Sequence, residues 1–380
     1  MDLRLTDDQQ LFHETTRKFL ESTCPLETVR QLADGEPAGY ERGWWKSGTA
    51  LGWTSLLVTE EDGGGSVSGH GLLDLVLVAE EMGRLVSPGP LMPVNVVTEA
   101  LCRSGTDEQR RQVLPGLLDG ASIASWCWGA PAAGIDTGGA VRVTPTTDGF
   151  IIDGVSGPTE GGAEADVHLV TVVTTAGPTQ LLVPSNHPGV RAEKMHSLDL
   201  VRRYAKVSFD HVEVPREMVI GEVGGAAGDV EHQLQTAVVL QCAEMAGAVE
   251  RVFEFTVEYA TDRYSFGRPL VSYQALKHRF ADLKTWLEAS LATAGAAARS
   301  VDTASKSAAE LVSVAKAYIG ERGPAILQDC VQLHGGIGVT WDHDLHLYLR
   351  RVMVDVTQLG MPREHRERVA VSMGMGEVER

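Results

Sequence analysis

The residues best suited to chemistry in this sequence are an arginine and an aromatic residue at the end of a long apolar-periodic segment. Arg263 lies three positions before Phe266, and Gly267 follows. The i, i+3 spacing predicts both side chains on one side of a helix end, and the glycine admits a ligand close to the backbone. A guanidinium can donate paired hydrogen bonds to a pyrophosphate while a ring stacks on an adenine. The pattern therefore indicates a dinucleotide site, although the same residues could simply end a helix.

A second segment carries glycines and polar residues at the end of another apolar helix. Residues 332–340 read Gln-Leu-His-Gly-Gly-Ile-Gly-Val-Thr. With the Arg263 to Gly267 segment, Gln274 and Asp282, this order resembles the C-terminal domain of the acyl-CoA dehydrogenase family. Further segments that match the family pattern are Leu5–Gln9, Leu51–Trp53, Glu60–Gly64 and Leu198–Arg203. The resemblance runs from about residue 4 to about residue 372.

Composition excludes some classes of function. The formal net charge of the 380 residues is −18, and such a charge does not favour binding to nucleic acid, which requires a positively charged surface. No run of 18 apolar residues indicates a membrane span, and residues 1–4 do not begin a secretory signal. We therefore expect a cytoplasmic protein with no nucleic-acid or membrane partner. A single arginine can still bind an anion despite the overall negative charge.

Cysteine and histidine spacing argues against a metal site and a disulfide framework. The five cysteines are scattered and never form a C-x-x-C pair, so we expect buried apolar thiols. His343 and His346 have i, i+3 spacing with His334 nearby, but no pattern of further ligands accompanies them.

The sequence divides into three blocks, which predict an α+β fold. Residues 1–120 show mostly helical periodicity, residues 121–228 contain short Val, Ile and Thr runs between turns, and residues 229–380 are helical again. The resemblance implies an N-terminal all-α domain, a middle β-barrel domain and a C-terminal four-helix-bundle domain. It also implies that the last block contributes to cofactor binding and to packing as a dimer of dimers.

The reaction that the resemblance implies needs a carboxylate base. Family members remove a proton next to a thioester and pass a hydride from the next carbon to FAD. The commonest base position, 27 residues beyond the glutamine of Gln-x-x-Gly-Gly, is Leu359 here. The other base position, 29 residues before the phenylalanine of Arg-x-x-Phe-Gly, is Ala237. We therefore expect no catalytic residue in this chain.

The half of the site that would hold the flavin ring also departs from the family pattern. Residues 128–136 occupy the stretch whose hydroxyls hold the ring in relatives, and they lack its Thr and Ser. Pro158 occupies the position of an aromatic residue that packs on the flavin. Proline offers neither a π-face nor an N–H donor.

The residues that would bind the ADP half of the cofactor are all present. The resemblance assigns this role, across a subunit interface, to Arg263, Phe266, Gln274, Gln332, Gly335 and Gly336. The chain thus resembles the non-catalytic subunit of bacterial heteromeric acyl-CoA dehydrogenases of the steroid-degrading type. Its implied partner is a homologous catalytic subunit in an α2β2 complex that shares FAD. An acyl-CoA, with a steroid side-chain CoA ester as one candidate, would be the substrate. An electron-transfer flavoprotein or similar protein would be the acceptor.

Two other functions stay open at this point. A self-sufficient dehydrogenase would need a relocated base, and the candidates for it are Glu231, Glu244, Asp355 and Glu364. A flavin-free thioester-binding or scaffold protein would use Arg263 and Gln332 only as structural residues.

Overall fold

The computed structural model describes residues 5–35, 40–128 and 141–375. Helices α1 to α6 make up the N-terminal part of the described chain: α1 (Asp7–Thr23), α2 (Leu26–Asp34), α3 (Arg42–Thr49), α4 (Gly71–Arg84), α5 (Leu91–Ser104) and α6 (Asp107–Leu118). Thr6 and Gln9 form a capping box at the start of α1, which confirms that this segment opens a helix. Gln9 also donates to Asp74 Oδ1 at 2.8 Å and so ties α1 to α4.

The middle part consists of two four-stranded sheets. One has the order β1-β4-β5-β8 and the other β2-β3-β7-β6. The bounds are β1 (Ala124–Cys127), β2 (Val141–Pro145), β3 (Gly149–Glu160), β4 (Val167–Thr174), β5 (Gly177–Pro184), β6 (Val190–Lys194), β7 (Tyr204–Pro215) and β8 (Val219–Ile220). Alternate residues of both sheets, such as Ile152, Val170 and Phe209, share one apolar core. The expected β-rich middle domain is confirmed, as two sheets that enclose a common core.

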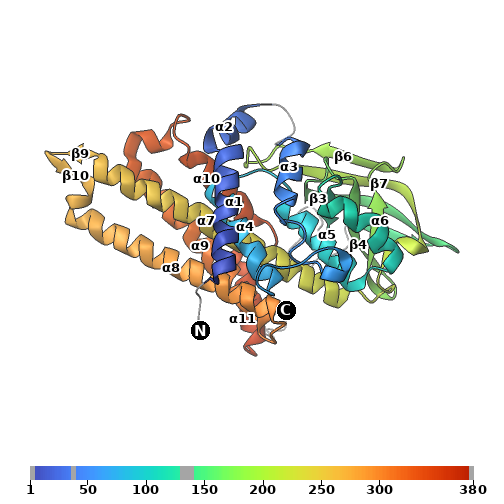
Figure 1. Cartoon of the computed structure of the whole chain (residues 1–380). Coiled ribbons are helices and arrows are strands. Elements are labelled where there is room, and N and C mark those ends of the chain that lie inside the picture. The colour runs from blue at the N-terminus through green and yellow to red at the C-terminus, as the bar shows by residue number, and fades with distance from the viewer. Residues whose placement is uncertain (1–4, 36–39, 129–140, 376–380) are drawn as a thin grey trace.

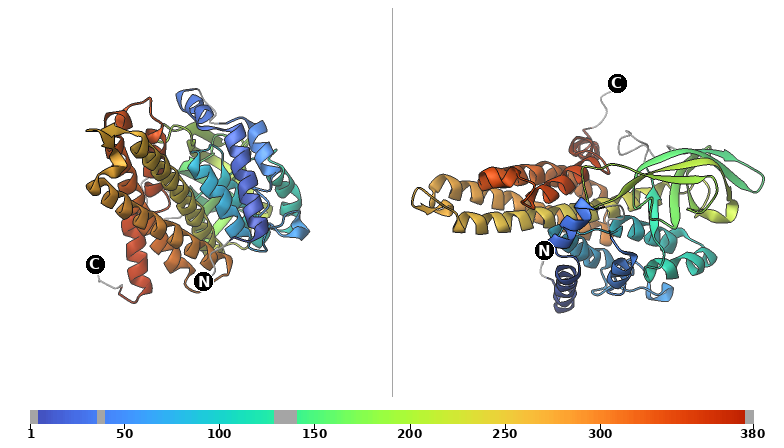
Figure 2. Two further views of the ribbon diagram at one scale, coloured as in Figure 1. Left: turned by 60° about the vertical axis from the view of Figure 1, so that its left-hand side comes forward. Right: turned by 90° about the horizontal axis from the view of Figure 1, so that it is seen from above.

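Long helices form the C-terminal part. They are α7 (Ala227–Asp262), α8 (Gln274–Asp302), α9 (Ala308–His334), α10 (Leu345–Thr357) and α11 (Pro362–Ser372). Figure 1 shows α7, α8 and α9 running away from the sheets, with the short hairpin β9–β10 at their far end. The two views in Figure 2 show the same arrangement. The α-β-α order of the chain agrees with the predicted fold, and the domain boundaries at residues 120 and 228 stay a prediction.

Helices α4 and α7 cross at two glycines, and this contact positions the centre of the molecule. A side chain at Gly83 would overlap the backbone of α7 at Glu244, and one at Gly247 would overlap the backbone of α4 at Glu80. Glycine at both positions lets the two backbones touch. Glu244 lies at this crossing, in direct contact with α4, so the crossing determines its position. No helix of the described residues is long and apolar enough to cross a membrane.

Candidate functional site

The Arg263 motif forms a tight hairpin. Helix α7 ends at Asp262, and Arg263 already has an extended backbone with φ −84° and ψ 118°. Strands β9 (Tyr264–Ser265) and β10 (Arg268–Pro269) pair antiparallel. The turn between them is Phe266-Gly267, with φ of 49° and 79°. The sequence prediction that Arg263 and Phe266 share one side of a helix end is therefore wrong in its local geometry. A two-residue hairpin turn with positive φ at both positions places Phe266 at the tip of the hairpin, beyond the end of α7.

The glycine motif ends α9. Gln332 is exposed in the last turn, and Gly335 follows the helix with φ 64°. No heavy atom lies within 4 Å of a Cβ built on Gly335 or Gly336, so this backbone is open to a ligand. Tyr259 Oη donates to the carbonyl oxygen of His334 at 3.2 Å, and the two rings stack with centroids 4.5 Å apart. These contacts join the ends of α7 and α9.

The predicted cofactor residues therefore lie at one end of the helical bundle, and each is solvent-exposed. Phe266 has 97% of its surface exposed. Gln274 begins α8 directly after the hairpin and is exposed as well. Other large apolar side chains exposed in the two motif segments are Tyr264, Ile337, Val339 and Trp341. A monomeric protein seldom gathers exposed aromatic and aliphatic side chains around an open backbone without a binding role.

This end of the bundle fits the ADP half of a dinucleotide. Arg263 makes no side-chain hydrogen bond or ion pair with any other described residue, so its donors are available. The uncovered glycine backbone admits a phosphate or ribose, and the Phe266 ring admits a stacked base. These residues could hold the ADP part of FAD, whose flavin part would supply hydride acceptance.

Neither expected base position can accept a proton. Leu359 is half-buried against the core with φ 58°, and its carbonyl oxygen lies 3.0 Å from His365 Nε2. Ala237 is fully buried in α7. Pro158 is an exposed residue of β3. Residues 129–136 of the expected flavin stretch lie outside the described residues. Leu359, Ala237 and Pro158 therefore supply neither a carboxylate nor an aromatic ring at these three positions.

Two of the four candidates for a relocated base have local roles at the surface. Glu231 accepts from Arg368 Nη2 at 2.6 Å. Glu364 accepts from the backbone N–H of Met361 at 2.6 Å and caps its own helix α11. Each carboxylate is occupied by a neighbouring group, which is the common state of a solvated helix-face acid.

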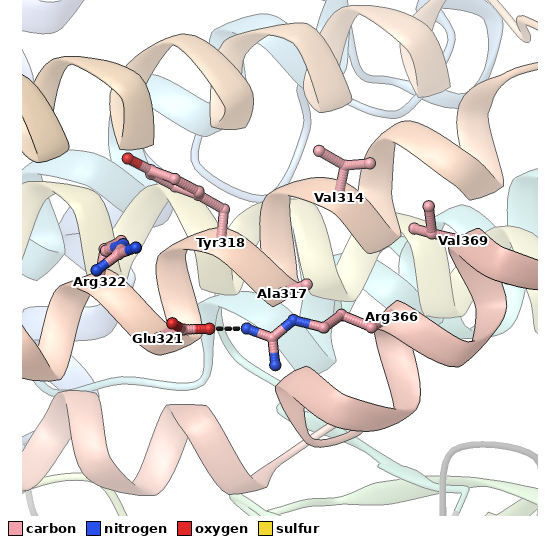
Figure 3. Close-up of a pocket in the computed structure, with 7 residues that line it drawn as sticks. All are labelled: Val314, Ala317, Tyr318, Glu321, Arg322, Arg366 and Val369. Carbon is pink, nitrogen blue, oxygen red and sulfur yellow. Dashed lines mark ion pairs between the residues drawn. The ribbon is translucent and has the colours of Figure 1, made fainter.

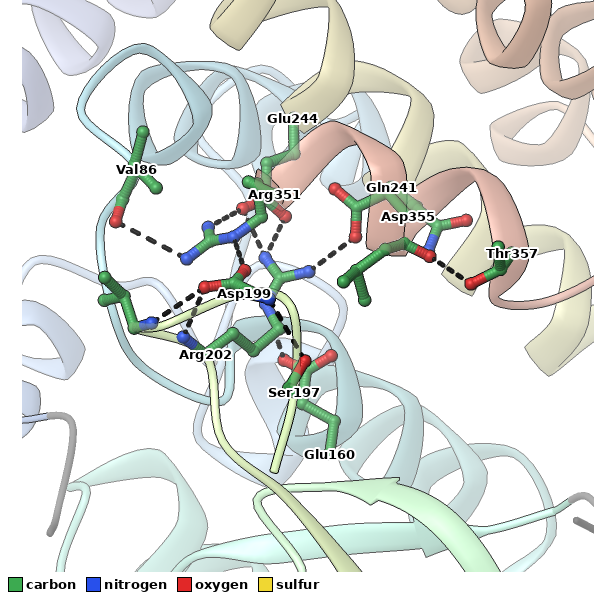
Figure 4. Close-up of polar contacts among 12 residues, drawn as sticks. Val86, Glu160, Ser197, Asp199, Arg202, Gln241, Glu244, Arg351, Asp355 and Thr357 are labelled. Atoms are coloured by element: carbon green, nitrogen blue, oxygen red, sulfur yellow. Dashed lines mark hydrogen bonds and ion pairs between the residues drawn. The ribbon is translucent and has the colours of Figure 1, made fainter. Parts of the chain in front are cut away.

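The other two candidates belong to a buried ion-pair network where the three parts of the chain meet (Figure 4). Glu244 of α7 pairs with both Arg202 and Arg351. Asp355 Oδ1 lies 3.0 Å from Arg202 Nη1. Asp199, in the loop before β7, pairs with Arg351 and accepts from the backbone N–H of residues 201 and 202. Because both carboxylates are held by guanidinium groups, neither is a free base.

Arg351 is the centre of this network. Its side chain is fully buried on α10 and pairs with Asp199 and Glu244. It also donates to the carbonyl oxygens of Val86 and Ser87, in the loop after α4, at 3.3–3.4 Å. A single guanidinium thus joins the N-terminal helices, the sheet domain and the C-terminal helices.

The network contains one more acid than base. Its cations are Arg202, Arg351 and Lys316, and its acids are Glu160, Asp199, Glu244 and Asp355. Burial raises the pKa of Glu160 from 4.5 to about 7 against the opposing pull of Arg202. Burial also raises the pKa of Asp355. The network therefore favours a state with a bound proton near neutral pH.

The raised pKa values make stability depend on pH. Between about pH 4.5 and 7 the folded chain binds more protons at Glu160 and Asp355 than the unfolded chain does, so these two groups lower the free energy of unfolding as pH rises. Burial lowers the pKa of His168 and of His365 to about 4, and these two groups act in the opposite direction. Glu160→Gln removes one group of the first kind, so the free energy of unfolding of the variant is expected to fall less, or rise more, with pH than that of the parent. Denaturant unfolding at pH 5.5, 6.5 and 7.5 measures the slopes. Equal slopes for the parent and the variant would show that Glu160 does not titrate in this range.

The cavity that touches the network is far too small for a substrate. It has a volume of about 10 Å³, and its lining includes Tyr40, Pro90, Glu160, Arg202 and Arg203. Ligand pockets usually have about 300–1,000 Å³. Neither a thioester nor a flavin ring fits here.

Larger grooves among the described residues lie elsewhere, and those of about 320, 400 and 840 Å³ contain none of the predicted cofactor residues. The groove of about 400 Å³ lies between α9 and α11, where Glu321 and Arg366 form an ion pair beside Tyr318 (Figure 3). The groove of about 840 Å³ runs between the Leu56–Leu72 segment, α5, α7 and the end of α8. Its most buried polar pair is Glu99 and His232, 2.7 Å apart. Among the described residues, no group of three or more His, Cys, Asp or Glu side chains could hold a metal ion.

Comparison with known proteins identifies the family. The acyl-CoA dehydrogenase N-terminal domain model matches residues 6–121, and the C-terminal domain model matches residues 228–373. The acyl-CoA dehydrogenase IpdE2 of Mycolicibacterium smegmatis is 30% identical over 96% of this chain and 98% of its own length. The chain belongs to the acyl-CoA dehydrogenase family. The resemblance drawn from the sequence motifs is thereby confirmed.

Solved acyl-CoA dehydrogenases share the fold. A glutaryl-CoA dehydrogenase from Mycobacterium smegmatis in complex with FADH2 superposes with a TM-score of 0.88 at 21% identity, covering 99% of this chain and 97% of that one. A variant of the Tcur3481–Tcur3483 steroid ACAD superposes with a TM-score of 0.86 at 24% identity, covering 97% and 98%. The α-β-α architecture of the acyl-CoA dehydrogenases is therefore present here from end to end.

Proposed function

We propose that this chain is the non-catalytic, FAD-sharing subunit of a heteromeric acyl-CoA dehydrogenase. Its partner is a homologous catalytic subunit in an α2β2 complex, and the complex dehydrogenates an acyl-CoA thioester between the α and β carbons. One observation carries the proposal. The motif residues that face outward are intact and exposed, whereas Leu359 and Ala237 occupy the base positions and an ion-pair network fills the interior.

The interior network argues against a self-sufficient dehydrogenase. A relocated base would need a free carboxylate next to a substrate-sized cavity. Glu244 and Asp355 are paired with arginines, and the adjoining cavity has about 10 Å³. Within the part of the chain that the structure describes, this cavity leaves no room for a thioester beside either acid.

The charge of the exposed end argues against a purely structural role for the motifs. Residues 263–279 contain no Asp or Glu, although the chain as a whole carries a net charge of −18. The same segment contains Arg263, Arg268 and Lys277, and also Arg279, which pairs with Asp329 of α9; Asp262 directly precedes this segment. A local positive potential of this kind attracts a pyrophosphate over short distances despite the distant negative charge. The cofactor contacts that we assign to this chain are Arg263, Phe266, Gln274, Gln332, Gly335 and Gly336.

The nature of the substrate is part of the proposal. One solved relative is described as a steroid ACAD and is named for two proteins together, Tcur3481 and Tcur3483. A steroid side-chain CoA ester is therefore the substrate class that we favour. Because the acyl pocket would belong to the catalytic subunit, this chain would influence it only through the shared cofactor. An electron-transfer flavoprotein would take the electrons from the reduced complex.

Expression with and without a partner tests this function. The chain purified alone is expected to be colourless at 450 nm and to oxidise no acyl-CoA. Co-expression with a catalytic acyl-CoA dehydrogenase subunit encoded beside it is expected to give a yellow, active complex. A yellow and active single chain, with activity lost on Glu244→Gln or Asp355→Asn, would support the self-sufficient dehydrogenase instead. Colourless protein in every combination would support the flavin-free scaffold.

A further inference from the structure

The turn at the tip of the β9–β10 hairpin presents an aromatic ring in an unfavourable backbone conformation. Phe266 has φ 49°, in the left-handed region that bulky side chains rarely adopt. Its ring packs on almost nothing in this chain, since 97% of its surface is exposed. A turn of this kind needs support from neighbouring residues to keep its shape.

Two residues outside the motif provide that support. Tyr273 Oη donates to the carbonyl oxygen of Ser265 at 2.6 Å. This hydrogen bond anchors β9 in addition to the backbone pairing between β9 and β10. The Arg268 guanidinium lies 3.8 Å from the centre of the Tyr273 ring, which holds β10 against the same side chain. The backbone N–H of Leu270 donates to the Arg263 carbonyl at 2.9 Å. Tyr273 therefore connects both strands of the hairpin at once.

We propose that Tyr273 and Arg268 are positioning residues that hold Arg263 and Phe266 in the geometry that binds the shared cofactor. This inference rests on the proposed function, because it concerns the same FAD contact.

The side-chain hydrogen bond and the cation–π contact of Tyr273 and Arg268 involve only neighbouring residues of the hairpin. We therefore expect these two residues to affect the shape of the hairpin and not the stability of the whole chain. Arg268 is exposed, and Tyr273 is only half-buried at the start of α8. Neither belongs to the apolar core of the chain. Their loss should therefore loosen the hairpin and leave the helical bundle intact.

Conservative variants in the co-purified complex test the inference. Tyr273→Phe keeps the ring and removes only the hydroxyl, and Arg268→Met removes the cation, whereas Arg268→Lys keeps a cation over the ring. Tyr318→Phe, in the groove of Figure 3, makes the same chemical change on a different helix, α9, and serves as the matched control. Arg263→Ala reports whether the motif binds FAD at all. The readouts are the FAD dissociation constant, from recovery of free-flavin fluorescence, and the melting temperature of the FAD-free complex, because weaker FAD binding alone would lower the melting temperature of the loaded complex.

Tyr273→Phe and Arg268→Met are expected to raise the FAD dissociation constant about three- to tenfold, the size of one lost hydrogen bond or cation–π contact. Arg268→Lys is expected to retain most of the affinity, and the melting temperature should match that of Tyr318→Phe. If Arg263→Ala loses FAD while Tyr273→Phe and Arg268→Met bind it as tightly as the control, the positioning role is wrong and the proposed function stands. If Arg263→Ala also retains FAD, the proposed function itself fails. A fall in melting temperature that matches the loss of affinity would show a merely structural role.

Discussion

Arg351→Met is expected to destabilise the chain by about 3–5 kcal/mol, the usual result of removing one partner from a buried ion-pair network. The variant would leave Asp199 without its strongest cation and Glu244 with only Arg202. It would also remove the donors to the Val86 and Ser87 carbonyl oxygens. Denaturant unfolding of the parent and the variant measures the difference in the free energy of unfolding.

A neighbouring arginine provides the control for this loss. Arg350 is partly exposed, donates a long hydrogen bond of 3.4 Å to the Leu198 carbonyl oxygen, and lies 5.7 Å from the centre of the Trp341 ring. Arg350→Met is expected to change stability far less. In a second variant, Asp199→Asn combined with Arg351→Met neutralises the orphaned carboxylate and should recover part of the loss. Equal destabilisation by Arg350→Met and Arg351→Met would contradict the central role of the network.

Arg263→Ala is expected to weaken FAD binding to the complex by about 1.5–3 kcal/mol, or roughly 10- to 100-fold. The reason is the loss of charge-assisted hydrogen bonds to the pyrophosphate. The Arg263 side chain forms no hydrogen bond or ion pair with another described residue, so the fold of the free chain should be unaffected. Titration of the apo complex with FAD measures the affinity.

The matched control for this variant lies on the last helix. Arg363 is an exposed arginine of α11 whose nearest acid is Glu367, one helical turn away. Arg363→Ala makes the same chemical change on another element and is expected to leave FAD affinity unchanged. A complex of the Arg263→Ala variant that retained FAD as tightly as the Arg363→Ala control would show that the motif has no part in cofactor binding.

Much of this account could be predicted from the sequence because local patterns carried it. Helical periodicity before Asp262 and His334, and strand signals such as Val167–Thr174, gave the α-β-α order. The spacing of Arg263, Phe266 and Gln332 identified the family, and the structure places these residues together at one exposed end. The sequence prediction was wrong about the local structure that joins α7 to α8. A positive φ at Phe266 turns the chain into a hairpin, whereas residue spacing alone suggested a helix end.

The ion-pair network could not be predicted in the same way. Its ion pairs join residues that lie 42 to 153 positions apart along the chain, so no local period relates the partners. In the sequence Glu244 and Asp355 were candidates for a relocated base, whereas Arg351, within the apolar pattern of α10, and Glu160, the last residue of β3, carried no signal of a shared site. A charged residue at a position that periodicity assigns to the core is the one available signal, since burial of an unpaired charge is prohibitive. Such a residue indicates that an oppositely charged side chain lies nearby, but it does not identify that side chain.

The number of flavins in the purified complex tests the central claim most directly. If this chain completes the cofactor site of its partner and has no site of its own, the complex contains one FAD per pair of unlike subunits. Flavin absorbance at 450 nm after denaturation, divided by the concentration of each chain from amino-acid analysis, gives this ratio. We expect one FAD for each copy of this chain and its partner taken together. A ratio of two would mean that this chain binds a flavin of its own, and the non-catalytic function would have to be abandoned.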